Sequence, residues 1–285
     1  MTWIIPAILL FASSVCLYLL VRKNQIENVP HAVSNLAMFG IPVIVFAFMN
    51  YVQGNSIFIG AEYLFIIFLA ALFCSYLGNV FSLMGIDLSP NPGYSLIISK
   101  SYVVFTSVAA VYFFNSPLTL KSILAILCII AFSALITVQK VQKKKSHNLW
   151  VVYSLGAFFA WGILALVSRY LINQQIPVTV TLFWVSLFVS FFVMVEILVT
   201  KTKIPFSKKT VFLFIGIGAA SSIFNFFMQE GYRLAPNPGF INAANAASIS
   251  LLTLMAHFFY KDELNLRKVI GIIGVTAGLI MLFIK

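Results

Sequence analysis

The sequence predicts an all-α integral membrane protein with ten transmembrane helices, arranged as two inverted five-helix repeats. Three observations lead to this fold class. The chain of 285 residues is 61% hydrophobic and only 9% charged, which is too apolar for a water-soluble globule. It contains ten apolar runs of about 20 residues, the length that crosses a hydrocarbon core. Finally, one motif recurs at an offset of 146 residues, which indicates an internal duplication.

The ten apolar runs occupy nearly the whole chain, so we expect no soluble domain. They cover residues 3–21, 31–51, 62–87, 93–114, 119–138, 149–171, 177–199, 210–234, 238–259 and 266–284. The first run has no basic start and no small-residue cleavage site. We therefore interpret it as a membrane span and not as a signal peptide.

The recurring motif is Pro-Asn-Pro-Gly, at residues 90–93 and again at 236–239. Around it, ten of the 38 positions in residues 85–122 are identical to residues 231–268. Proline cannot continue a preceding helix, but it is tolerated in the first turn of the next one. Each copy therefore predicts the end of one span and the start of another.

The front of each half supports the duplication at an offset of 147. There Trp3, Arg22 and Pro30 correspond to Trp150, Arg169 and Pro177. Because each half has five spans, an odd number, the second half must enter the membrane in the opposite orientation to the first. We divide the chain into a first repeat, residues 1–143, and a second, inverted repeat, residues 144–285.

The net charge of +11 reports orientation and does not indicate nucleic-acid binding. The odd-numbered loops carry 13 Lys or Arg residues, whereas the even-numbered loops and the C-terminus carry four. Basic loops of short length stay in the cytoplasm. We therefore expect a multi-pass protein of the bacterial cytoplasmic membrane with both termini facing outward.

Lys100 is the most informative charge, because it lies seven residues beyond Gly93 and so well inside the fourth span. Its stripe is otherwise mainly apolar, whereas the matching stripe of the ninth span carries Asn242 and Ser250, with Asn245 beside it. These unlike faces predict an asymmetric small-molecule site between the halves, where Lys100 meets an anionic group. The alternative is that Lys100 reaches toward the interface and the amides join helices.

Further candidates for the site come from amides and aromatics inside the spans. Asn79 and Asn225 occupy equivalent positions in the third and eighth spans. Tyr102, Tyr153 and Trp161 could wall a cavity. Packing between helices is the competing interpretation for each of them.

Gly274 and Gly278 have GxxxG spacing in the tenth span. Such small residues let two helices approach closely. One alternative is packing within the monomer, and the other is a homodimer through this helix.

The layout of ten spans in two inverted halves resembles the EamA-like transporters of the drug/metabolite transporter (DMT) superfamily. The best motif is the end of the ninth span, where Phe259, Tyr260 and Glu263 match the family pattern of an aromatic, a polar residue and Glu. The first half has Pro117 at the position of the Glu. The resemblance implies a secondary carrier with a central cavity walled by the first four helices of each half. Members with cytoplasmic termini are known, but the bias of 13 basic residues against four favours the outward assignment here.

The resemblance and the position of Lys100 together predict a function. We expect a secondary active transporter that moves an amino-acid-like or other carboxylate- or phosphate-bearing solute by alternating access. The alternative is a carrier of cationic or neutral compounds such as quaternary amines or drugs. The expected partners are the solute, a coupling ion and the lipid bilayer. No cofactor, metal or nucleic acid is expected, and an enzyme is disfavoured because no catalytic constellation is found.

Overall fold

A computed structural model describes residues 2–138, 149–205 and 207–284. They form helices α1 (Ile4–Ile26), α2 (His31–Gln53), α3 (Ala61–Leu69), the π-helical segment η1 (Ala70–Tyr76), α4 (Leu77–Leu88), α5 (Pro92–Lys100), α6 (Tyr102–Phe114), α7 (Leu120–Thr137), α8 (Leu149–Asn173), α9 (Val178–Val199), α10 (Lys208–Leu234), α11 (Pro238–Tyr260) and α12 (Leu266–Phe283).

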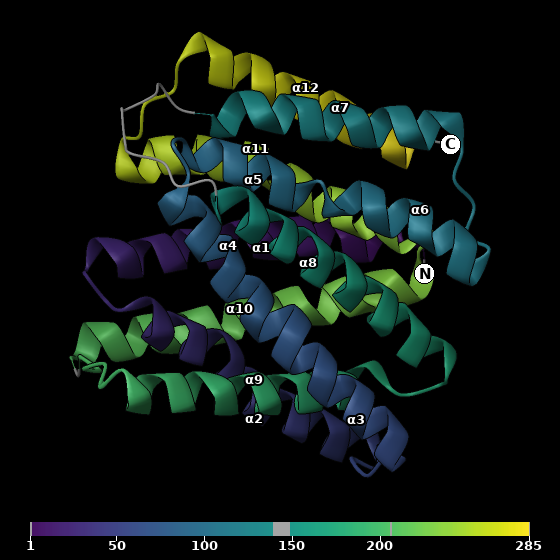
Figure 1. The fold of residues 1–285 in the computed structure, drawn as a ribbon, viewed down its shortest axis with the longest axis vertical. Coiled ribbons are helices and arrows are strands. Elements are labelled where there is room, and N and C mark those ends of the chain that lie inside the picture. The colour runs from purple at the N-terminus through teal and green to yellow at the C-terminus, as the bar shows by residue number, and fades with distance from the viewer. Residues whose placement is uncertain (1, 139–148, 206, 285) are drawn as a thin grey trace.

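These elements make ten membrane spans in the part of the chain that the structure describes. The third span joins α3, η1 and α4, and the fourth joins α5 and α6. The spans alternate in direction, so both chain termini lie at one end of the bundle (Figure 1). The prediction of an all-helical protein with ten apolar spans is confirmed.

The two ends of the bundle are named here for use below. The terminal end holds both chain termini and the junctions α2–α3, α6–α7, α8–α9 and α10–α11. The basic end holds the junctions α1–α2, α4–α5, α9–α10 and α11–α12. In Figure 1 the terminal end is on the right and the basic end on the left. The predicted boundary between residues 143 and 144, and the basic residues from 140 to 145, lie outside the described residues.

Both Pro-Asn-Pro-Gly motifs form the predicted helix junctions. The helices before them end at Leu88 and Leu234, and those after them begin at the second proline of each motif. Asn91 and Asn237 cap the new helices, because their side-chain oxygens accept hydrogen bonds from the backbone N–H of Gly93 (3.0 Å) and Gly239 (2.8 Å). The cap satisfies a donor that the first turn leaves without a partner.

Helices of the first half pack against helices of the second half. The principal pairs are α7 with α12, α2 with α9, α1 with α10, and α4 with α8. Exchanging equivalent spans between the halves leaves this set of pairs unchanged, and α8 begins at the end opposite the start of α1 (Figure 1). The arrangement is compatible with the predicted inverted repeat.

α11 lies at the centre of the bundle. Its most apolar window is 67% buried, against 22–39% for the other nine spans. The composition explains this position, because Asn and Ser side chains are costly against lipid and need partners from neighbouring helices. The helix that carries Asn242, Asn245, Ser248 and Ser250 is therefore enclosed by protein.

The glycine face of α12 packs inside the monomer. A Cβ atom at Gly274 would overlap the ring of Phe132 on α7, and one at Gly278 would lie 2.9 Å from Ile129. These glycines let the α7 and α12 backbones approach closely. The glycine face is thus covered by α7, which is the intramolecular alternative of the sequence prediction.

Candidate functional site

A cavity of about 380 Å³ lies within the bundle, on the side of the basic end. α1, α2, α4, α5 and α7 each contribute the part of the helix nearest that end. The cavity reaches the surface beside Gln25 and His31, both of which are exposed. The polar residues that line it are Tyr18, Gln25, His31, Ser34, Asn35, Asn79, Ser82, Lys100, Ser133, Thr137, Trp161, Asn245 and Ser248.

Lys100 extends into this cavity from the last position of α5. Eight residues separate it from Pro92, which places it about 12 Å along the helix at 1.5 Å per residue. Its amino nitrogen lies 5.1 Å from the centre of the Trp161 ring, in cation–π geometry. Lys100 forms no ion pair with any residue that the structure describes.

The regular α-helix of the fourth span is interrupted at one residue, Ser101, directly after Lys100. Ser101 separates α5 from α6, and its hydroxyl donates a hydrogen bond of 2.7 Å to the carbonyl of Ile97. The backbone N–H of Val104 then bonds the carbonyl of Ser101, three residues back (2.9 Å). The span thus tightens locally into a 3₁₀-type turn beside Lys100, while the backbone N–H of Ser101 keeps its hydrogen bond to the carbonyl of Ile97 (3.1 Å).

Two amides of the first half face the cavity. Asn35 and Asn79 line it and are partly exposed. Neither side chain forms a hydrogen bond with another described residue. An unsatisfied amide in a membrane protein needs water or a bound solute as its partner. These two residues therefore give the cavity free donors and acceptors on the wall formed by α2 and α4.

The opposite wall, on α11, is already engaged in hydrogen bonds. The hydroxyl of Ser14 on α1 lies 2.9 Å from the hydroxyl of Ser248 and donates to the side-chain oxygen of Asn245 (3.3 Å). Asn245 and Ser248 line the cavity, whereas Ser14 is fully buried. This cluster ties the Asn245 and Ser248 side chains of α11 to α1.

No acidic side chain lines the cavity among the residues described. Of the described residues that line the cavity, Lys100 alone is a lysine, arginine, aspartate or glutamate. A cation that lacks a carboxylate partner creates a positive potential in a low-dielectric environment. The cavity is therefore suited to a bound solute that carries negative charge.

The structure brings four of the nine predicted site residues together. Lys100, Asn79, Asn245 and Trp161 all line the cavity. Tyr102 lies just behind it, fully buried and edge-on to the Trp161 ring. For these residues the prediction and the observed cavity coincide in position.

The remaining four predicted residues lie away from the cavity. Asn242 is fully buried and accepts a hydrogen bond of 2.6 Å from Tyr232. Asn225 donates to the carbonyl of Ser221 on its own helix, Ser250 donates to the carbonyl of Ala247, and Tyr153 packs against Phe81. In this conformation Asn242 and Tyr153 join helices, which was the competing interpretation, whereas Asn225 and Ser250 bond within their own helices.

Residues missed by sequence reasoning come mostly from α2 and α7. Asn35 and Ser34 lie on α2, and Ser133 and Thr137 lie on α7. Asn35 could have been found, because it is an amide inside an apolar run. The hydroxyl residues could not, since Ser and Thr also bond to carbonyls of their own helix, as Thr137 does with Ser133 (3.1 Å).

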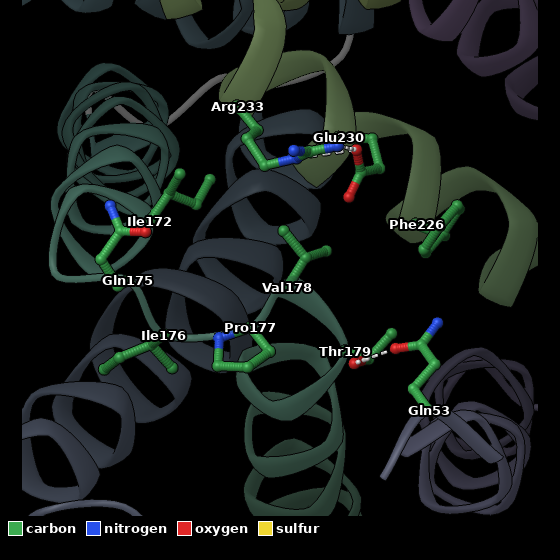
Figure 2. A pocket seen from close by; sticks show the side chains of 10 residues that line it. All are labelled: Gln53, Ile172, Gln175, Ile176, Pro177, Val178, Thr179, Phe226, Glu230 and Arg233. Carbon is green, nitrogen blue, oxygen red and sulfur yellow. Dashed lines mark hydrogen bonds and ion pairs between the residues drawn. The ribbon is translucent and has the colours of Figure 1, made fainter. Parts of the chain in front are cut away.

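A second pocket of about 280 Å³ opens at the terminal end (Figure 2). It lies among the end of α8, the start of α9 and the last turns of α10. Glu230 and Arg233 face each other on one wall and form an ion pair of 2.5 Å. On the other wall, Thr179 donates a hydrogen bond of 3.2 Å to Gln53 of α2 (Figure 2).

No metal site is seen in the part of the chain that the structure describes. No group of three His, Cys, Asp or Glu side chains comes close enough to hold an ion there. The residues that line the cavity offer charge attraction, hydrogen bonding and apolar contact.

Comparison with known proteins gives a family match for the second half of the chain and a fold match for the whole of it. Residues 148–284 match the EamA-like transporter family. A solved structure titled "Crystal structure of protein" has a TM-score of 0.80 with the chain, covers 98% of it and 97% of its own length, and is 11% identical. At that identity the similarity shows the fold alone. No curated protein matches the chain.

Proposed function

We propose that the chain is an EamA-like secondary active transporter for a small organic anion, and the match of residues 148–284 to the EamA-like transporter family supports this proposal. It is a membrane transporter of the drug/metabolite type. The solute class that we propose is amino-acid-like or carries another carboxylate or a phosphate. Transport proceeds by alternating access around the cavity at Lys100.

One observation carries the substrate class. The amino group of Lys100 lies in the cavity without a carboxylate partner among the described residues. Bringing a charge to membrane depth is costly unless it has a function or a partner. A carboxylate or phosphate on the solute would supply the missing partner, and Asn35 and Asn79 would bind its polar groups.

The alternative substrate class, cationic or neutral compounds, has one feature in its favour. Much of the cavity wall is apolar, including Leu96, Ile130 and Leu252. However, the Trp161 ring is occupied by Lys100, and Glu230 is paired with Arg233 at the other end of the bundle. A quaternary amine would therefore have to displace a cation and would find no free carboxylate in the cavity.

The orientation that we propose follows from the loop charges. With the basic loops in the cytoplasm, the cavity of this conformation opens inward and both termini face outward. The lipid environment that we propose is the bacterial cytoplasmic membrane.

Uptake into proteoliposomes tests the substrate class. Amino acids, dicarboxylates, phosphorylated metabolites and choline-like cations would be offered one at a time, with and without a proton or sodium gradient to identify the coupling ion. We expect uptake of at least one anion by the parent protein. Lys100→Met should lower that uptake at least about tenfold, because an ion pair with a desolvated charge is lost.

Lys100→Arg is the matched control for this test, since it keeps the positive charge. It should retain more activity than Lys100→Met toward the same anion. Equal uptake of the anion by the parent and by Lys100→Met would remove the assigned role of Lys100. Uptake of cations alone would favour the alternative class.

A further inference from the structure

The central helix α11 packs differently at the two ends of the bundle. At the terminal end, Gly239 of α11 contacts Ser107 of α6 so closely that a Cβ atom would overlap it, and the amide of Asn237 donates to the carbonyl of Ser107 (3.0 Å). At the basic end, Gly93, the counterpart of Gly239, instead packs against the carbonyl of Thr137 on α7. The fourth and ninth spans are thus joined at the terminal end and separated by the cavity at the basic end.

Two residues of the cavity wall correspond, at the repeat offset of 146, to two buried residues near the terminal end. Ile86 and Leu96 line the cavity at the basic end. Their counterparts at an offset of 146 are Tyr232 and Asn242, which are 3% and 0% exposed. The hydroxyl of Tyr232 donates a hydrogen bond of 2.6 Å to the side-chain oxygen of Asn242.

The second pocket corresponds to the mouth of the open cavity. Gln25 and His31 form that mouth at the basic end. Their counterparts at an offset of 147 are Ile172 and Val178, and both line the pocket at the terminal end (Figure 2). A buried hydrogen bond of 2.9 Å from Gln229 to Ser168 lies on the same pair of helices, α8 and α10.

From these relations we infer that the pocket at the terminal end is the outer part of a second access route, and that the Tyr232–Asn242 hydrogen bond holds this route closed. The basic end has only apolar residues at the equivalent positions, so the bond is specific to one end. The inference rests on the proposed function and names the residues that control access to the same site.

Asn242 has a second role in this inference. Its amide nitrogen is buried and has no hydrogen-bond partner among the described residues. A buried donor without a partner is costly. When the route opens, this nitrogen becomes available to an oxygen of the solute, which complements Lys100 on the fourth span. Asn242 thereby favours solutes that carry a hydrogen-bond acceptor.

Cysteine labelling in oriented vesicles tests the inference without measuring transport. Cys16, Cys74 and Cys128 are first replaced. Single reporters are then placed at the terminal-end pocket, as Val178→Cys, and in the open cavity, as Ser34→Cys. A membrane-impermeant maleimide is added to each side in turn.

Tyr232→Phe removes only the hydroxyl that makes the bond. We expect it to raise the labelling rate of Val178→Cys about fivefold, equivalent to about 1 kcal/mol at 1.4 kcal/mol per factor of ten, and to lower that of Ser34→Cys. Asn242→Leu, which introduces the residue found at position 96, should act in the same direction. Tyr76→Phe is the control, since it removes a tyrosine hydrogen bond (to Glu196, 3.1 Å) that lies at neither pocket.

Opposite changes at the two reporters support the inference. Unchanged labelling at both reporters, or a rise at both, would overturn it. The outcome is separable from the proposed function. Opposite changes together with no uptake of any solute would leave the route intact and reject the transporter assignment to organic anions, whereas uptake without any change in labelling would reject only the role of Tyr232 and Asn242.

Discussion

At the scale of single residues, the ring of Trp161 determines where the amino group of Lys100 lies. Lys100 could extend toward the interface on its flexible stem, but its nitrogen lies over the face of Trp161 at 5.1 Å. The ring provides an attraction that needs no carboxylate. We propose that Trp161 positions the charge while leaving it available to a solute.

Replacing Trp161 tests this positioning role. Trp161→Leu should raise the KM for the transported anion about fivefold, because a partly desolvated cation–π contact is worth about 1 kcal/mol. Trp161→Phe keeps a π-face and should show a smaller increase. Initial rates of uptake over a range of solute concentrations measure both. Equal KM values for the parent and Trp161→Leu would contradict the role.

At the scale of elements, the start of α11 is held by one asparagine with two tasks. The side-chain oxygen of Asn237 caps the helix, and its nitrogen bonds the carbonyls of Ser107 (3.0 Å) and Pro117 (3.5 Å) in the first half. A capping residue therefore also joins the two halves at the terminal end.

Two substitutions separate these tasks. Asn237→Ser retains a capping oxygen and loses the amide donor, whereas Asn237→Ala loses both. We expect the thermal unfolding midpoint in detergent to fall in the order parent, Ser, Ala, with the last step equivalent to about 1 kcal/mol for the cap. Identical midpoints for the Ser and Ala variants would show that the cap contributes nothing.

The α7–α12 pair illustrates a close contact built on glycine. Gly274 has no side chain, so the ring of Phe132 on α7 packs directly against the backbone of α12. α7 and α12 form the most extensive helix pair, at the side of the bundle (Figure 1). Their contact supports α11, which packs against both of them.

Gly274→Ala should destabilise this pair. Overpacking of a well-filled contact costs about 1–3 kcal/mol, which would appear as a lower unfolding midpoint. Phe132→Leu removes the ring that the new methyl group would meet, so the double variant should recover part of the loss. A double variant that is less stable than either single variant would argue against this contact as the cause.

At the scale of the whole molecule, charge and architecture together define two unlike ends. The described basic residues outside the spans are concentrated at the basic end, to which the cavity opens. The ends differ in polarity even where the repeat relates them, as in the pair Ile86 and Leu96 against Tyr232 and Asn242. If the two halves are repeats, as their motifs predict, the chain can still have directional properties.

The orientation in the membrane is testable with reporter fusions. Alkaline phosphatase is active only outside the cytoplasm, whereas a fluorescent protein of the usual type matures inside. If the basic loops are cytoplasmic, a C-terminal phosphatase fusion should be active and a C-terminal fluorescent fusion dark. The opposite pair of results would place the termini in the cytoplasm and the cavity of this conformation on the outer side.

The sequence by itself determined the fold class and the positions at which several helices end and begin. Ten spans follow from hydrophobic length, and the junctions at residues 90–93 and 236–239 follow from the backbone limits of proline. These features are local, so they can be read without knowing which helices are neighbours. They also explain how a structure with only 11% identity has the same fold.

Only the tertiary structure decided which polar residues form the site. A helical wheel places Asn242 and Lys100 on corresponding stripes, but it contains no information about the helix opposite each stripe. Asn242 meets Tyr232 and is buried, whereas Lys100 meets Trp161 and faces the cavity. The Pro-Asn-Pro-Gly motif occurs at both ends, so the local pattern does not distinguish them. Which end is closed depends on contacts between helices distant in sequence, such as that of Gly239 with Ser107.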